Sequence, residues 1–308
     1  MISPTPLHLI HNTPLVRLDR LSGGEFNLYA KVEMFQPGFS IKDRAALQII
    51  ADAYGSGRLV KGQLVVEMIS GNMGAGLAVV CRQYGNPFVA VMSEGNSPER
   101  ARLLKALGAE VMLTPQVDGT PGMVTGKDIE HAAQIARQYA AENKGFYVDQ
   151  FNNPSSVKAH FTHTGPEIWD ALPKTDAFVA SVGSSGTFTG VARFLKSRNP
   201  GIRCVAVEPA GAAILKTGKV THPKHIIQGT GYGIIPPHWD PALADDILTV
   251  TDAEAAEMTR RLSLEQGLHV GYSSGANVAA AIRLATSGSG LKHVVTVLCD
   301  AGFKYSGL

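Results

Sequence analysis

The sequence has few of the features that mark membrane, nucleic-acid-binding or disulfide-stabilised proteins. Its 308 residues contain only three cysteines, Cys81, Cys204 and Cys299, which lie far apart in apolar segments. We interpret them as small core side chains in a reducing compartment, which excludes a disulfide framework or a zinc site. No apolar run approaches the roughly 18 residues of a membrane span. The net charge of +2 is too small to indicate a nucleic-acid or membrane surface.

Targeting and low-complexity segments are also absent. The first 18 residues lack the basic start and long apolar stretch of a signal peptide, so a cytoplasmic protein is expected. There is no biased tract and no short-period repeat. What is present is a globular balance of 44% hydrophobic and 18% charged residues. A chain of this length forms one large domain or two medium ones with real cores.

Apolar runs and turn residues alternate in an order that predicts an α/β fold. Strands are expected at 64–69, 87–92, 109–115, 176–182, 202–209 and 293–300, and helices at 77–85, 98–108, 127–143, 188–197, 252–267 and 275–285. Strands that consist of continuous apolar runs and alternate with helices indicate mainly parallel sheets covered on both faces. Ligands of such sheets bind at the carboxyl ends of the strands, on the turns that open helices. The long Gly- and Pro-rich loop 209–237 is also expected to be functional.

One lysine occupies an unusual position. In the segment "QPGFSIKDRAALQII" (36–50), Ser40 is typical of a helix N-cap and Asp43 completes a capping box. The helix is therefore expected to start at about Ile41. Lys42 then falls in the first turn, where the helix dipole and the free N–H groups disfavour a cation.

Three turns rich in Gly and Ser open predicted helices. The first, "SVGSSGTFTG" (181–190), has the parts of a phosphate cradle: glycines, three hydroxyl side chains and a following helix N-terminus. It lacks the Gly-Lys-Ser/Thr ending of a nucleotide P-loop and the dinucleotide spacing, so a small phosphomonoester fits better. An ordinary strand-to-helix turn is the alternative.

The second turn, "ISGNMGAG" (69–76), suits a carboxylate, because Ser70 and the helix N–H groups can donate and Asn72 can donate or accept. A tight turn without a ligand remains the alternative. The third turn is "HVGYSSGAN" (269–277). Three such turns in one chain, with a lysine at a buried helix start, favour a binding site.

The chain resembles one family over almost its whole length. Motifs of that family occur in its order and spacing: "NTPLVRL" (12–18), "FQPGFSIKDRAA" (35–46), "SGNMG" (70–74), "RARLLKALGAEVMLTP" (100–115), "HTGPEIW" (163–169), "GSSGTFTGV" (183–191), "VEPAGAAIL" (207–215), "IQGTGYG" (227–233) and "GYSSGANVAAA" (271–281). The family is that of cysteine synthase (O-acetylserine sulfhydrylase) and cystathionine β-synthase, the fold-type-II enzymes of pyridoxal 5'-phosphate (PLP). The resemblance implies two three-layer α/β domains of the tryptophan synthase β type and a homodimer. A larger PLP-binding domain, 1–44 plus 155–308, would enclose a smaller nested domain, 45–154.

The resemblance assigns the cofactor-binding residues position by position. Lys42 would form the imine with PLP, which accounts for a site that disfavours its ammonium form. Asn72 would bond the phenolic oxygen of the ring, and Ser273 would face the pyridine nitrogen. A neutral hydroxyl there favours β-elimination chemistry over transamination. The cofactor phosphate would be held by Gly183, Ser184, Ser185, Gly186 and Thr187.

Substrate residues follow in the same way, with departures from the family pattern. Around the substrate carboxylate, and around its amine and side chain, the matching positions are Ser70, Gly71, Met73, Gln150, Gly229 and Tyr232. The family's substrate loop usually reads Thr-Ser-Gly-Asn-Thr, and here Ile69 and Met73 replace the two threonines. Tyr232 stands where cysteine synthases often carry alanine and cystathionine β-synthases carry tyrosine. These changes leave open which amino acid is the substrate.

The reaction implied is β-replacement through an α-aminoacrylate in sulfur amino-acid biosynthesis. The favoured case is L-cysteine synthesis from O-acetyl-L-serine, or another activated serine, and sulfide. The alternative is a lyase or β-replacement that releases hydrogen sulfide from L-cysteine, with serine, lanthionine, cystathionine or pyruvate as the product. A non-catalytic nucleotide-binding module is a further alternative that the lysine motif disfavours. Two histidines in "HFTH" (160–163) have no partner motif, so no metal site is expected. No nucleic-acid or membrane partner is expected.

Overall fold

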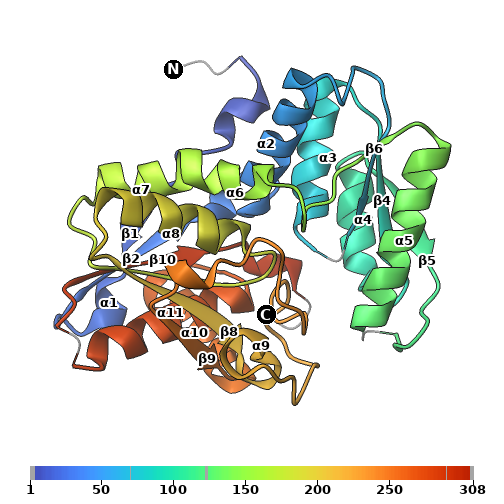
Figure 1. Cartoon of the computed structure of the whole chain (residues 1–308). Helices are drawn as coiled ribbons and strands as arrows, with labels where there is room; N and C mark the ends of the chain where they lie inside the picture. Colours follow the sequence, from blue (N-terminus) through green and yellow to red (C-terminus); the bar gives the residue numbers. More distant parts are fainter. Residues whose placement is uncertain (1–3, 70, 122–123, 289, 306–308) are drawn as a thin grey trace. The chain divides into compact units, whose positions relative to one another are not determined.

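The computed structural model describes residues 4–69, 71–121, 124–288 and 290–305. They divide into two compact units, each with its own sheet (Figure 1). The smaller unit contains residues 36–156 and the described residues before His11. The larger unit contains residues 11–35 and 157–305. In the described part of the chain, no helix is both long and apolar enough to cross a membrane.

The smaller unit is built on a parallel sheet with the strand order β5-β4-β3-β6. The strands are β3 (Val65–Met68), β4 (Phe88–Ser93), β5 (Glu110–Thr114) and β6 (Phe146–Tyr147), and the helices are α2 (Lys42–Gly55), α3 (Met73–Tyr84), α4 (Pro98–Ala106) and α5 (Gly126–Glu142). Successive strand residues point to opposite faces. Val65 packs with α2, α3 and α4, and Val66 packs with α5. The sheet is therefore covered on both faces.

The larger unit has a mixed sheet with the strand order β1-β2-β10-β7-β8-β9. The strands are β1 (Leu15–Arg17), β2 (Asn27–Val32), β7 (Ala177–Ser181), β8 (Arg203–Pro209), β9 (Asp246–Val250) and β10 (His293–Leu298). Only β1 runs antiparallel to its neighbour, β2, among the described strands.

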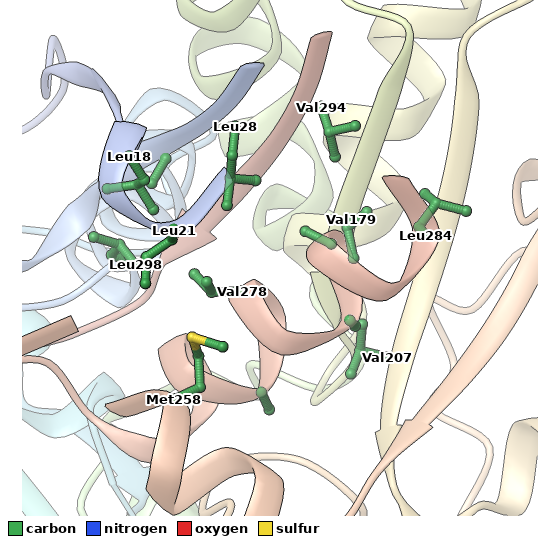
Figure 2. Packing of buried hydrophobic residues seen from close by; sticks show 14 of the residues in the cluster. Leu18, Leu21, Leu28, Val179, Val207, Met258, Val278, Leu284, Val294 and Leu298 are labelled. Carbon is green, nitrogen blue, oxygen red and sulfur yellow. The ribbon is translucent and has the colours of Figure 1, made fainter. Parts of the chain in front are cut away.

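Helices cover both faces of this sheet too. They are α1 (Asp19–Ser22), α7 (Gly165–Ala171), α8 (Gly186–Arg198), α9 (Ile214–Thr217), α10 (Asp252–Gln266) and α11 (Tyr272–Thr286). In Figure 2, Met258 of α10 and Val278 of α11 pack with strand residues such as Val179 and Val207. On the opposite face Phe178 of β7 stacks on Phe188 of α8, with ring centroids 6.4 Å apart.

The predicted alternation of strands and helices is confirmed, with differences in detail. Each predicted strand overlaps an observed one, and α11 begins at Tyr272, three residues earlier than expected. The sequence did not predict β1, β2, β6 and β9. It also missed the helical segment 155–171, which contains α6 (Ser155–Ala159) and a π-helical turn, His160–Thr164. β6 is only two residues long and β9 is half-buried over most of its length, so neither produces a strong apolar pattern.

The start of α2 differs from the expected capping box. The helix begins at Lys42, and Ile41, already helical with φ −56°, takes the N-cap position. Ser40 accepts a hydrogen bond from the Lys42 N–H at 3.3 Å. The Asp43 carboxylate accepts the N–H of Gly38 and not that of Ser40. Asp43 therefore stabilises the turn before the helix and does not form a capping box.

The two units also divide the chain at different places from the expected domains. Residues 36–44, with Lys42, belong to the smaller unit, as do residues 4–10. The physical reason is packing: Ile10 lies in one apolar cluster with Ile49 and Ile50 of α2 and with Leu77 of α3. Lys42 is thus carried by the smaller unit.

Candidate active site

In the larger unit, the predicted phosphate loop follows β7 and opens α8. A Cβ atom at Gly183 would lie 2.1 Å from the carbonyl oxygen of Gly229, so only glycine fits there. Ser185, the residue before α8, has φ +67°, a left-handed conformation that is unusual outside glycine. Ser184 and Ser185 are buried. The loop therefore combines hydroxyl side chains with the first N–H groups of α8, a combination that suits an anion.

A histidine that the sequence analysis left without a function supports this loop. Nε2 of His160 lies 3.2 Å from the hydroxyl oxygen of Thr187, and its Nδ1 lies 2.9 Å from the hydroxyl of Thr164. His160 is 2% exposed. The hydroxyl of Ser185 bonds that of Thr189 at 3.0 Å, and Thr189 donates to the carbonyl of His238 at 2.8 Å. The hydroxyls of the loop are thus held by a network of side chains.

The structure brings the long loop 209–237 next to the phosphate loop. Besides the contact of Gly229 with Gly183, a Cβ atom at 183 would lie 3.9 Å from the ring of Tyr232. Gly229 has φ +87°, which favours glycine. Thr230 donates to the carbonyl of Ile227 at 2.7 Å and fixes the turn. The predicted substrate residues of this loop therefore lie beside the predicted phosphate site.

Ser273 lies in the first turn of α11 and is 6% exposed. Its surroundings are tied to the sheet by neighbouring residues of the helix. Asn277 accepts the N–H of Ser181 at 2.7 Å and donates to the carbonyl of Val297 at 2.9 Å. Ser274 accepts the N–H of Cys299 at 2.9 Å. The start of α11 is therefore fixed at the carboxyl ends of β7 and β10.

In the smaller unit, Lys42 and the second Gly/Ser turn stand at two helix starts. Lys42 is half-buried in the first turn of α2, followed by the buried residues Asp43 and Arg44. A Cβ atom at Gly76 would lie 3.0 Å from the Cα of Asp43, so α3 approaches the start of α2 closely. Glycine at 76 therefore allows the two helix starts to lie side by side.

The turn itself leads from β3 into α3. Gly71 is exposed, and Asn72 takes the N-cap position of α3. The side chains of Ile69 and Met73 are each 2% exposed and lie in the apolar core of the smaller unit. Ser70, a predicted substrate residue, lies outside the described residues. The side chain of Met73 therefore packs in the core, which leaves only its backbone in the first turn of α3 for contact with a ligand.

Gln150 lies just beyond β6, next to the end of β3 in the sheet. Its backbone N–H points to Oε1 of Glu67 at 3.5 Å, and the N–H of Asp149 donates to Oε2 of Glu67 at 2.7 Å. Burial raises the pKa of the Glu67 carboxyl to about 8. Sequence reasoning missed Glu67, although a charged residue inside the apolar run "LVVEMI" is a signal that could have found it.

Each unit, taken by itself, carries groups of kinds that a phosphorylated carbonyl cofactor requires. The larger unit has the anion cradle around Gly183 and a neutral hydroxyl, Ser273, at a helix start. The smaller unit has the amine of Lys42 and the amide of Asn72. No group of three or more His, Cys, Asp or Glu side chains with metal-binding geometry occurs in the described ranges. These residues fit PLP, which needs an amine, a phosphate site and a partner for its ring nitrogen.

Comparison with known proteins agrees with this fold and donor set. The chain belongs to the pyridoxal-phosphate dependent enzyme family, whose model matches residues 7–300. Within that family its similarity is to the cysteine synthase and cystathionine β-synthase group, so it is a fold-type-II PLP enzyme. It is 38% identical over 299 residues to an O-acetylserine dependent cystathionine beta-synthase of Bacillus subtilis (strain 168), covering 96% of this chain and 94% of that one.

Solved structures give the same result. The crystal structure of O-ureido-L-serine synthase superimposes with a TM-score of 0.92 at 35% identity, over 100% of this chain and 95% of that one. A hydrogen sulfide-producing enzyme from Fusobacterium nucleatum gives a TM-score of 0.90 at 36% identity, over 99% of both chains.

Proposed function

We propose that this chain replaces the β-substituent of an activated L-serine, such as O-acetyl-L-serine, by sulfide and so forms L-cysteine. The observation that carries the proposal is the hydroxyl of Ser273 in the buried first turn of α11. A neutral partner at the ring nitrogen favours elimination and replacement at the β-carbon over transamination. Relatives named cysteine synthase and O-acetylserine dependent cystathionine beta-synthase support the same chemistry.

Bound PLP would supply an electron sink for the carbanion that remains when the α-proton leaves. Lys42 would hold the cofactor covalently and, once released by the substrate amine, would take up the α-proton with its neutral amine. Its place in the first turn of α2 disfavours the ammonium form. Asn72 would donate to the phenolic oxygen, and the loop 183–187 would hold the phosphate.

The substrate would be oriented by both predicted sets of residues. Gly71 and Met73 would offer backbone N–H groups at the start of α3, and Gln150 its amide, to the carboxylate. Ser70 would add a hydroxyl. Gly229 and Tyr232 would lie near the amine and the β-substituent. The leaving group departs with its electron pair, sulfide adds to the β-carbon, and a proton returns to the α-carbon.

A second reaction has a specific observation in its favour. Tyr232, which cystathionine β-synthases share, lies beside the cradle, and a structural relative at 36% identity is a hydrogen sulfide-producing enzyme. We therefore propose L-cysteine as an alternative donor, with hydrogen sulfide as the leaving group. Water or a thiol would then add to the β-carbon, or the 2-aminoacrylate left after loss of hydrogen sulfide would be released and hydrolysed by water to pyruvate and ammonia.

We also propose that the chain works as a homodimer in the cytoplasm. The cysteines, of which Cys81 and Cys204 are buried, are compatible with a reducing compartment. The dimer rests on the resemblance. Light scattering should give about twice the chain mass of 32.6 kDa.

The experiment compares wild type with Lys42→Ala and, as a control, Lys105→Ala, an exposed lysine on α4. Wild type and Lys105→Ala should absorb visible light and carry a borohydride-reducible link to PLP, and Lys42→Ala should lose both while it stays folded. Turnover of O-acetylserine plus sulfide is then compared with that of L-cysteine alone and with a second thiol. A Lys42→Ala protein that keeps the reducible link and its turnover would overturn the proposal.

A further inference from the structure

The segment 299–305, which follows β10 in the larger unit, folds back onto the turn that opens α11. The N–H of Gly302 donates to the carbonyl oxygen of His269 at 3.0 Å. Two residues further along the turn, the N–H of Gly271 donates to the carbonyl oxygen of Asp300 at 3.1 Å. The segment is therefore tied to the backbone that leads into this helix.

Side chains of the segment close around Gly271, the N-cap residue of α11. As a glycine it has no side chain that could cap the helix. A Cβ atom at this position would collide with Oδ1 of Asp300 and would lie 2.5 Å from Cε2 of Tyr305. Asp300 is fully buried. Its carboxyl group thus lies at the N-terminus of α11, where the helix dipole favours a negative charge.

The two side chains that flank Gly271 are bonded to each other. The hydroxyl of Tyr305 donates to Oδ2 of Asp300 at 2.5 Å. The ring of Tyr305 also meets the ring of Tyr272 edge to face, with centroids 5.8 Å apart. A hydrogen bond to a carboxylate is stronger than one between neutral groups. The pair of Asp300 and Tyr305 therefore holds the first two residues of the helix start.

The residue after Ser273 is held as well, but the hydroxyl of Ser273 itself is not. Ser274 accepts the N–H of Cys299, the first residue of the segment, at 2.9 Å. Ser273 is 6% exposed, and within the described ranges its hydroxyl makes no hydrogen bond to another residue. Its neighbours on both sides are thus fixed by residues 299–305, while its own hydroxyl remains for a ligand.

We propose that Asp300 and Tyr305 are positioning residues, which hold Gly271 and Tyr272 so that the hydroxyl of Ser273 faces the ring nitrogen of bound PLP. The inference rests on the proposed function, in which Ser273 is the partner of that nitrogen. Neither positioning residue touches the cofactor in this assignment. Hydrogen bonds weaken steeply as their angle departs from linear, so a small rotation of the first turn of α11 is enough to lose this one.

Tyr305→Phe is the informative variant, because it removes one oxygen atom and keeps the ring that packs on Tyr272. The buried carboxyl group of Asp300 then loses this donor, and the turn loses its support. We expect the Kd of PLP, measured by equilibrium dialysis, to rise by roughly three- to tenfold, the value of one hydrogen bond. The visible absorbance of the bound PLP should change as it does in Ser273→Ala.

A double-mutant cycle separates positioning from a general loss of stability. In a Ser273→Ala background the hydroxyl is absent, so Tyr305→Phe should have no further effect on the Kd of PLP. A purely structural role predicts that the two losses multiply. Losses that multiply, or a Tyr305→Phe protein with the Kd and the spectrum of wild type, would overturn the inference.

Asp300 is tested by a conservative and a disruptive variant. The amide oxygen of Asp300→Asn can still accept the Tyr305 hydroxyl, whereas Asp300→Ala cannot. Asp300→Asn should therefore keep most of the wild-type PLP affinity and spectrum, and Asp300→Ala should reproduce Tyr305→Phe. Equal losses in the two Asp300 variants would contradict a role for this hydrogen bond. If Asp300→Ala does not fold, the cycle with Tyr305→Phe still decides.

The chain offers a matched control in Tyr272, the other ring of the pair. Its hydroxyl makes no hydrogen bond to a residue that the structure describes. Tyr272→Phe should bind PLP as wild type does, and a loss as large as that of Tyr305→Phe would count against the assignment.

A further measurement uses the protein without PLP. The N–H of Ser274 donates to the carbonyl oxygen of Gly271 at 3.0 Å and reports on the first turn of α11. Its hydrogen exchange should be roughly three- to tenfold faster in Tyr305→Phe than in wild type or Tyr272→Phe. Equal exchange in all three proteins would overturn the inference. Failure of the proposed function appears in wild type itself, which would then form no cysteine from O-acetylserine and sulfide, whereas failure of the inference appears only in the variants.

Discussion

Nε2 of His160, in a π-helical turn, lies 3.2 Å from the hydroxyl oxygen of Thr187 in the phosphate loop. Nδ1 of the same ring lies 2.9 Å from Thr164. If the proton is on Nε2, the ring donates to Thr187 and accepts from Thr164. The proton of the Thr187 hydroxyl then remains for an anion.

We expect His160→Phe to weaken PLP binding by roughly five- to thirtyfold, because one oriented hydroxyl bond to the phosphate is lost. Equilibrium dialysis of PLP measures this. His163→Phe is the matched control, since His163 lies in the same turn but stacks on His11 at 3.9 Å. Equal PLP affinity in the two variants would show that His160 has no part in the loop.

Gly183→Ala tests the cradle. Its Cβ would lie 2.1 Å from the carbonyl oxygen of Gly229, a backbone atom that cannot move without the loop. The variant should lose most of its PLP and keep its secondary structure by circular dichroism. Gly126→Ala, at the open first position of α5, should behave like wild type. PLP bound by Gly183→Ala at the wild-type level would mean that the phosphate lies elsewhere.

Met73→Thr tests the role of the altered substrate loop. Because the thioether is 2% exposed in the core, a threonine leaves a cavity and a buried hydroxyl. We expect a loss of about 2–4 kcal/mol in the free energy of unfolding, measured by urea denaturation. Met73→Leu, which conserves volume, should lose less than about 1.5 kcal/mol. A stable Met73→Thr would place this side chain outside the core.

Asp128 tests the pH dependence of stability. Burial alone would favour its neutral acid, but the N–H groups of Thr125 at 2.9 Å and Val117 at 2.7 Å outweigh this and lower its pKa below the usual range. A lowered pKa contributes stability above the unfolded-state value, and this contribution disappears as the pH falls through the folded-state value.

Asp128→Asn should therefore cost about 2 kcal/mol in urea unfolding at neutral pH, and the difference from wild type should shrink towards about pH 2–3. Asp118→Asn is the control, because its ion pair with Lys127 at 3.3 Å lies at the surface and contributes little. A difference between wild type and Asp128→Asn that does not change with pH would show that the loss is one of packing.

The sequence predicted the alternation of strands and helices because buried parallel strands such as β4 and β7 are mostly apolar along their whole length. It also identified the turns at 69–76, 183–187 and 269–277 as helix starts. Their contacts could not be predicted. Thr187 and His160 are far apart along the chain, and the sequence has no pattern that pairs them.

The buried side chains of the substrate turn were also beyond sequence reasoning. The sequence shows that Ile69 and Met73 stand where the family has threonines. These residue types are compatible both with the wall of a pocket and with a hydrophobic core. Only the packing distinguishes the two, and it places both side chains in the apolar cluster. The replacement of the two threonines by Ile69 and Met73 therefore affects the packing that supports the turn as much as the contacts of the turn with a ligand.

The packing of Ile69 and Met73 into one core restricts which substitutions this turn can accept during evolution. A Cβ atom at Gly74 would lie 2.9 Å from Ile69 and 2.8 Å from Leu104, so the space around the turn is already filled. A single change to threonine at 69 or 73 places a hydroxyl in an apolar interior before any ligand contact is gained. A protein with threonine at both 69 and 73 can therefore be reached from this sequence only through single variants that are less stable. Such variants are tolerated once unrelated substitutions have raised the stability of the fold.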